Sequence, residues 1–267
     1  MIDRVFVQNA FNEYVNSFDL NAEKIALKKD HSFHVAEVSE ELGRALNLND
    51  NDVELAWLIG QLHDIGRFTQ LRDFDTYNDS ISVDHARLGA DILFKQGRIW
   101  DYLHEDDLNA NDLRIVEIAI REHNAFEVRE DLSEREQLFC NIIRDADKID
   151  IFRVISEYPP EATWEVTVEQ LRTSTISEKV IELVRNHSLV RKEYRITPLD
   201  QLVGAVSMIF GMNYDYSVIL SKRQGNIEKI FNNVICPSDK NETIEYVTRI
   251  VYDYMNSLFL PGALGDM

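Results

Sequence analysis

Histidine and aspartate side chains gather in the N-terminal part of this chain. Six of its seven histidines lie within the first 123 residues. Neutral imidazoles and carboxylates that converge from different helices are ligands that transition-metal sites use. The residues that lie near the ends of expected helices, or on helices with an otherwise apolar face, are His31, His63, Asp64, His85, His123 and Asp147. These residue types in this order are compatible with a metal site.

The adjacent pair His63 and Asp64 is the most informative of these features. It follows the apolar segment Ala56–Leu62 and precedes Ile65-Gly66-Arg67. A charged aspartate beside an apolar helix is unfavourable unless a positive group compensates its charge. A bound cation would provide that compensation. The alternative is a helix end whose two polar side chains face water.

The segment Leu62-His63-Asp64-Ile65-Gly66-Arg67 resembles the signature of the HD superfamily of metal-dependent phosphohydrolases. The motif of that family is a histidine, a later His-Asp pair and a final aspartate, all on helices around one metal ion. His31 resembles the first histidine and Asp147 the final aspartate, and the likeness extends over residues 22–155. The resemblance implies that one metal ion is held by His31, His63, Asp64 and Asp147.

Two further segments resemble the binuclear members of this superfamily. His85 opens a segment similar to their His-x-x-x-Gly-x-x-Ile-Leu pattern, and residues 118–124 are similar to the helix that bears their next histidine, here His123. Those relatives include cyclic-dinucleotide phosphodiesterases, diadenosine polyphosphate hydrolases and di-iron oxygenases. The resemblance implies a second metal ion at His85 and His123, bridged to the first by Asp64. Asn124 replaces the second histidine of several relatives and no Gly-Tyr-Pro follows, which argues against cyclic-dinucleotide cleavage.

Basic residues near these positions are candidates to bind phosphate oxygens. We expect this role for Arg67 and Lys148, and Arg121 and Arg144 are further candidates. Each of them has the alternative of a solvated position on a helix surface. The predicted catalytic residues are His63, Asp64, Arg67 and Lys148. Asp79 and Asp84, near His85 in the sequence, are candidates to orient its ring.

The resemblance implies hydrolysis of a phosphoester or phosphoanhydride bond in a nucleotide or another small phosphorylated metabolite. A metal ion lowers the pKa of bound water from about 16 towards about 7, and a second ion can clamp the attacking and leaving oxygens. The expected cofactor is one or two divalent ions, and Fe, Mn, Zn, Co, Ni and Mg all remain open. The alternatives are a di-iron oxygenase of the same family and a non-catalytic regulatory module that binds a nucleotide.

Helical periodicity extends over nearly the whole chain. Gly and Pro are scarce, with ten and five residues, and no proline precedes Pro159. Few residues that break helices indicate an all-α protein. We expect an HD-type helical bundle over residues 1–158, with its core motifs in residues 22–155. Residues 159–267 are expected to form a helical C-terminal extension packed on that bundle.

Local signals place the ends of several elements. Ser133 followed by Glu136 is a capping box that begins a long helix. Ser82 and Asn111 are expected to begin the helices that carry the later histidines. Residues 164–168 are predicted to form a short strand.

Charge and hydropathy exclude several classes of partner. The chain has 47 acidic and 28 basic side chains, which gives a formal net charge of −19. This charge repels duplex phosphates and argues against duplex nucleic acid as a partner. The longest apolar stretch, residues 202–212, is too short to cross a bilayer, and the N-terminus does not resemble a signal peptide. We therefore expect a cytoplasmic protein that acts on a small phosphorylated substrate.

Overall fold

The computed structural model describes residues 2–19, 23–164, 166–234 and 242–258. Every regular element among these residues is helical, so the predicted all-α class is confirmed. Contacts divide the chain into two compact units, residues 1–147 and 148–267. The helix α7 (Glu134–Glu157) runs through this division. The sequence predicts the domain boundary between residues 158 and 159, just after the end of α7. This boundary stays a prediction.

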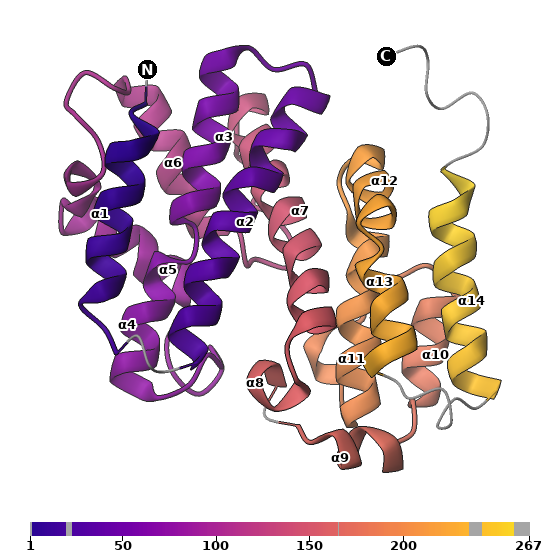
Figure 1. Ribbon diagram of the computed structural model, residues 1–267. Coiled ribbons are helices and arrows are strands. Elements are labelled where there is room, and N and C mark those ends of the chain that lie inside the picture. The colour runs from indigo at the N-terminus through magenta and orange to yellow at the C-terminus, as the bar shows by residue number, and fades with distance from the viewer. Residues whose placement is uncertain (1, 20–22, 165, 235–241, 259–267) are drawn as a thin grey trace. The chain divides into compact units, whose positions relative to one another are not determined.

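The first unit contains six α-helices before α7 in its described residues, and Figure 1 labels them. They are α1 (Arg4–Asn16), α2 (Glu23–Ala45), α3 (Asp50–Leu62), α4 (Ile65–Phe74), α5 (His85–Ala90) and α6 (Ala110–Glu122). The helices α2 and α3 pack along one another, and α5 contacts both α4 and α6. A π-helical turn, η1 (Asp91–Lys95), continues α5, and a 3₁₀ turn, η2 (Arg98–Asp101), follows it.

Side-chain caps mark the starts of several of these helices. The caps of α5 and α6 are not the residues that the sequence predicted. Asp84 caps α5 by accepting hydrogen bonds from the backbone of Ala86 and Arg87, both at 3.1 Å. Asn109 caps α6 in the same way. The predicted caps Ser82 and Asn111 were therefore each wrong by two residues. The capping box of α7 is confirmed, since the Glu136 carboxylate accepts from the Ser133 backbone at 2.8 Å.

The second unit contains the end of α7 and further helices packed around an apolar core. Its α-helices are α8 (Pro160–Trp164), α9 (Val168–Thr173), α10 (Glu178–Arg185), α11 (Pro198–Val206), α12 (Asp215–Gln224), α13 (Asn226–Lys229) and α14 (Glu242–Ser257). The shorter turns are η3 (Lys192–Tyr194), η4 (Ser207–Gly211) and η5 (Ile230–Val234). The strand predicted over residues 164–168 was wrong, because α8 ends at Trp164 and α9 begins at Val168. Thr167 forms a capping box with Gln170 there, which fixes a helix start where the apolar residues alone indicated a strand.

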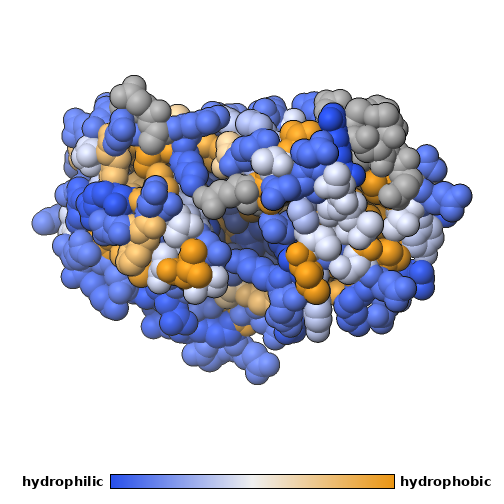
Figure 2. Space-filling view, turned by 90° about the horizontal axis from the view of Figure 1, so that it is seen from below, coloured by the Kyte–Doolittle hydropathy of each residue, from blue (hydrophilic) through white to orange (hydrophobic). Residues whose placement is uncertain are grey.

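The surface carries mostly hydrophilic side chains on the face that Figure 2 shows, with apolar side chains in smaller groups. Within the described part of the chain, none of the helices combines the length and the hydropathy that a bilayer-spanning segment needs.

A close backbone contact between α4 and α5 positions His85. Gly66 lies in the first turn of α4, and a Cβ atom added there would clash with the His85 carbonyl and lie 2.7 Å from the Gly89 nitrogen. The absence of a side chain at Gly66 thus allows α5 to approach α4 closely. This contact brings His85 next to the His63-Asp64 pair, which directly precedes α4.

We predict that Gly66→Ala lowers the free energy of unfolding by about 2–3 kcal/mol, because the added methyl group forces the two helices apart. Gly43→Ala is the matched control, since a Cβ there meets its nearest atom at 3.5 Å, an ordinary contact. That variant should keep or slightly increase the stability, because alanine favours a helix. Urea unfolding of both variants tests this difference, and equal stabilities would contradict it.

Candidate metal centre

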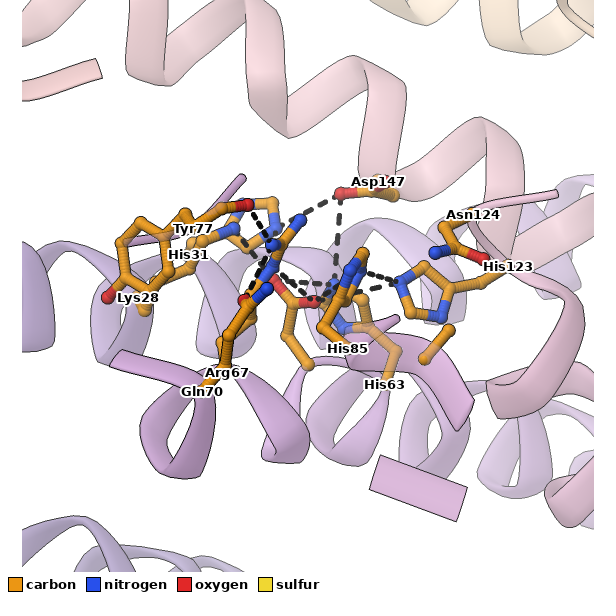
Figure 3. A network of polar contacts seen from close by, with 12 residues as sticks. Lys28, His31, His63, Arg67, Gln70, Tyr77, His85, His123, Asn124 and Asp147 are labelled. Atoms are coloured by element: carbon orange, nitrogen blue, oxygen red, sulfur yellow. Dashed lines mark hydrogen bonds and ion pairs between the residues drawn. The ribbon is translucent and has the colours of Figure 1, made fainter. Parts of the chain in front are cut away.

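The six predicted ligands lie close together. Figure 3 labels five of them, which are His31, His63, His85, His123 and Asp147. His31 lies in α2, His63 and His123 follow the last residues of α3 and α6, Asp64 precedes α4, His85 begins α5 and Asp147 lies in α7. The four histidines and Asp64 are buried. The side chain of Asp147 is 20% exposed, so it is the least buried of the six ligands.

The two oxygens of Asp64 face different pairs of imidazoles. Oδ2 lies 3.6 Å from Nε2 of His31 and 3.6 Å from Nε2 of His63. Oδ1 lies 3.4 Å from Nε2 of His85 and 3.6 Å from Nε2 of His123. Three groups of the described residues could hold a metal ion, and Asp64 is shared by two of them, one with His31 and His63 and the other with His85 and His123. The third group is Asp79, Asp84 and His85.

Asp147 joins the first of these groups. Its Oδ1 lies 3.1 Å from Nε2 of His31 and 3.7 Å from Nε2 of His63. Oδ1 of Asp147 thus lies close to both imidazoles of this group, and two carboxylates with two imidazoles are a ligand set suited to a divalent transition metal.

Hydrogen bonds to the outer nitrogen of three imidazoles fix their orientation. Nδ1 of His63 lies 2.8 Å from the Gly60 carbonyl, and Nδ1 of His123 lies 2.7 Å from the Ile120 carbonyl. Nδ1 of His85 lies 2.7 Å from Oδ2 of Asp79. Carbonyl and carboxylate oxygens only accept hydrogen bonds, so each Nδ1 carries the proton and each Nε2 presents a lone pair to the cluster.

This arrangement of lone pairs fits a bound cation. Nε2 of His85 and Nε2 of His123 lie 3.0 Å apart, and neither carries a proton while both Nδ1 atoms donate. Nε2 of His63 is buried and has no hydrogen-bond partner among the described residues. Lone pairs that face each other and the Asp64 carboxylate repel unless a positive charge lies between them. The residues therefore fit a bound metal.

Burial favours the neutral form, which binds metals, at His63 and His85. It lowers the pKa of His85 to about 4, helped by the charge of Arg67, and it lowers the pKa of His63 as well. Burial alone would raise the pKa of Asp64, but the charge of Lys28 and other neighbours outweigh it and hold that pKa well below the usual range. His63 and His85 are thus neutral imidazoles beside the ionised carboxylate of Asp64.

The basic residues predicted to bind phosphate have protein partners. Nη1 of Arg67 donates to the Tyr77 carbonyl at 2.6 Å, to Gln70 at 2.9 Å and to Asp79 at 3.0 Å. Lys148 donates to the Gly211 carbonyl at 2.5 Å. The catalytic roles of Arg67 and Lys148 stay predictions.

The two further candidates have structural partners too. Arg121 pairs with Asp91 and Glu117 at 2.9 Å and 3.0 Å. Arg144 donates to the carbonyls of Ala125 and Phe126, just beyond the end of α6. Arg144 thereby binds the segment that follows His123.

Two residues at the centre were not expected from the sequence. Nζ of Lys28 lies 2.7 Å from Oδ2 of Asp64. Lys28 precedes His31 by three residues, and that spacing on one helical face was the signal available. The fully buried Gln70 donates to Oδ1 of Asp79 at 2.9 Å and so holds the partner of His85, a role that no motif in the sequence indicated.

The comparison with protein families agrees with this geometry. Residues 29–151 match the family model of the HD domain, and all six candidate ligands lie within the match. Residues 29–151 are therefore similar to an HD domain. The comparisons found no match among curated proteins and none among solved structures.

We predict that the metal-free protein loses stability as the pH falls from about 6.5 to about 4. The pKa of His85 is 6.5 in the unfolded chain and about 4 in the folded one, so the unfolded chain binds the proton first. The stability that neutral His85 contributes is complete above pH 6.5 and is lost through this window, by on the order of 3 kcal/mol. Urea unfolding in the presence of a chelator at several pH values measures it.

Two variants isolate the contribution of His85 to this pH dependence. His85→Asn should reduce the loss of stability and leave the part that comes from His63, whose pKa burial also lowers. His104→Asn should leave the pH dependence unchanged, because His104 is exposed. The pKa values of Asp64 and Asp147 are lowered well below their ordinary value of 3.8. The stability that these two carboxylates contribute is therefore lost below this window. A wild-type profile that is flat between pH 6.5 and 4.5 would contradict the prediction.

Proposed function

We propose that this protein is a binuclear metal-dependent phosphohydrolase of the HD type. It hydrolyses a phosphoester or phosphoanhydride bond in a nucleotide or another small phosphorylated metabolite. One divalent ion is held by His31, His63, Asp64 and Asp147. The other is held by His85, His123 and the second oxygen of Asp64. The observation that carries the proposal is that Asp64 offers one oxygen to each pair of imidazoles.

Divalent ions held by these residues would lower the pKa of a bound water molecule and supply positive charge for an anionic substrate. The residues of the chain hold that centre in place. The Asp64 carboxylate sets the separation of the two ligand groups. The hydrogen bond from His85 to Asp79 keeps the ring oriented, and Gln70 and Arg67 in turn fix the Asp79 carboxylate.

The charge of the centre supports an anionic substrate. Lys28 and Arg67 lie beside Asp64, at 2.7 Å and 3.6 Å between the nearest charged atoms. Divalent ions would add positive charge to the same small volume, while the chain as a whole carries −19. A small phosphorylated molecule suits both the positive centre and the negative chain. It binds at the centre alone and brings little negative charge near the rest of the surface.

We predict that Asp64→Asn loses both metal ions and lowers phosphatase activity by about a hundredfold or more. The amide keeps the shape of the side chain but removes the charge that both ligand groups share. His123→Asn should lose one equivalent only, because His31, His63 and Asp147 do not depend on it. Elemental analysis of the purified protein measures the metal content, and release of inorganic phosphate from a panel of phosphorylated metabolites measures activity.

Asp50→Asn and His104→Asn are the matched controls, since both residues are exposed and lie outside the cluster. They should keep two equivalents of metal and full activity. Full metal content in Asp64→Asn would contradict the ligand assignment. Consumption of O₂ coupled to turnover, measured with an oxygen electrode, would instead favour an oxygenase. Binding of nucleotides without release of phosphate from any substrate would favour a regulatory module.

A further inference from the structure

Lys28 differs from the other cations around the candidate metal centre. Its Nζ lies 2.7 Å from Oδ2 of Asp64, and this carboxylate is its only hydrogen-bond partner among the described residues. The Lys28 side chain is 15% exposed and that of Asp64 is 3% exposed. The ammonium group thus lies at the border between the buried ligands and solvent.

Arg67 is bound far more firmly to the protein than Lys28 is. Its Nη1 alone donates to three oxygens, from Gln70, Tyr77 and Asp79. Moving the Arg67 guanidinium would break all of these bonds and free the Asp79 carboxylate that orients His85. Moving the Lys28 ammonium would break one bond, to a carboxylate that a metal ion would also neutralise.

The aromatic ring of Tyr77 lies beside Lys28 and Arg67 (Figure 3). The centre of its ring lies 5.8 Å from Nζ of Lys28 and 5.6 Å from Cζ of Arg67. Its hydroxyl donates to the Lys24 carbonyl at 2.8 Å, one turn before Lys28 in α2. The ring is therefore anchored to the same helix as Lys28 and limits where its ammonium group can move.

The net charge of the cluster around Asp64 would change sign when metal ions bind. The charged side chains of the cluster are Lys28, Arg67, Asp64, Asp79 and Asp147, and the two cations and three carboxylates give a net charge of −1. Two divalent ions would change this sum to +3. The Lys28 ammonium contacts Oδ2 of Asp64, the oxygen that His31 and His63 also face. The ions would therefore repel this ammonium group until an anion bound to the centre.

We propose that Lys28 is the anion-binding cation of this centre and that it couples metal binding to anion binding. In the metal-free protein it neutralises Asp64. With metal bound, its ammonium group binds an oxygen of the phosphoryl group instead. The inference rests on the proposed function and adds a residue that contacts the substrate. Because coupling is reciprocal, phosphate raises the affinity for metal by the same factor as metal raises the affinity for phosphate.

Calorimetric titration with Mn²⁺, with and without inorganic phosphate, tests this role in the wild type and in Lys28→Met. Methionine keeps a long unbranched side chain and removes the charge. Without phosphate, the variant should bind Mn²⁺ about threefold more tightly or better, because no ammonium competes for Asp64. The Mn²⁺-loaded variant should bind phosphate about tenfold more weakly, so that the coupling between the two ligands falls.

Lys28→Arg should keep most of the phosphate affinity, because it keeps a cation at this position. Lys29→Met is the matched control, since it removes the same charge from the next residue of α2, which has no ion pair among the described residues. It should change neither affinity. The Mn²⁺ stoichiometry of each variant shows that its centre is intact.

Equal phosphate affinity in the wild type and Lys28→Met would overturn the inference. Weaker Mn²⁺ binding by Lys28→Met without phosphate would overturn it too, because Lys28 would then support the ligands rather than compete with metal. These failures are distinct from a failure of the proposed function, in which the wild-type protein itself would bind no Mn²⁺ and release no phosphate.

Discussion

The shared carboxylate of Asp64 is the constraint on which the rest of the structure depends. A buried carboxylate is unfavourable without compensating charge, and here both of its oxygens face imidazole nitrogens that present lone pairs. Such a cluster is stable when cations lie between the carboxylate and the rings. The connection of α3 to α4, the close approach of α5 and the partners of each histidine all serve to place ligands around this one side chain.

Two of the histidines are oriented by the same kind of hydrogen bond. His63 and His123 each follow the last residue of a helix, and each donates from Nδ1 to the carbonyl three residues before it, at Gly60 and Ile120. Carbonyls in the last turn of a helix lack a backbone partner, so a histidine at this position can satisfy one of them and direct its Nε2 away from the helix axis. His85 lies at the start of a helix, where no such carbonyl is available, and it uses Asp79 instead.

Much of the helical scaffold could be predicted from the sequence, because periodicity, capping boxes and the scarcity of glycine and proline are local properties. The errors were local as well, since Ser82 and Asn111 are good capping residues that lie two positions from the ones that cap. The resemblance also placed the six candidate ligands, whose assignment stays a prediction. What could not be predicted is which cation faces Asp64. Arg67 is closer in sequence, but Lys28 makes the 2.7 Å contact, because only the packing of α2 against α3 brings it there.

The shared position of Asp64 between two ions can be observed directly. Crystals of the Mn²⁺-loaded protein, measured at the manganese absorption edge, would show each ion as an anomalous peak. The account predicts two peaks on opposite sides of the Asp64 carboxylate, one among His31, His63 and Asp147 and the other between His85 and His123. A single peak, or an Asp64 carboxylate that contacts only one ion, would contradict it.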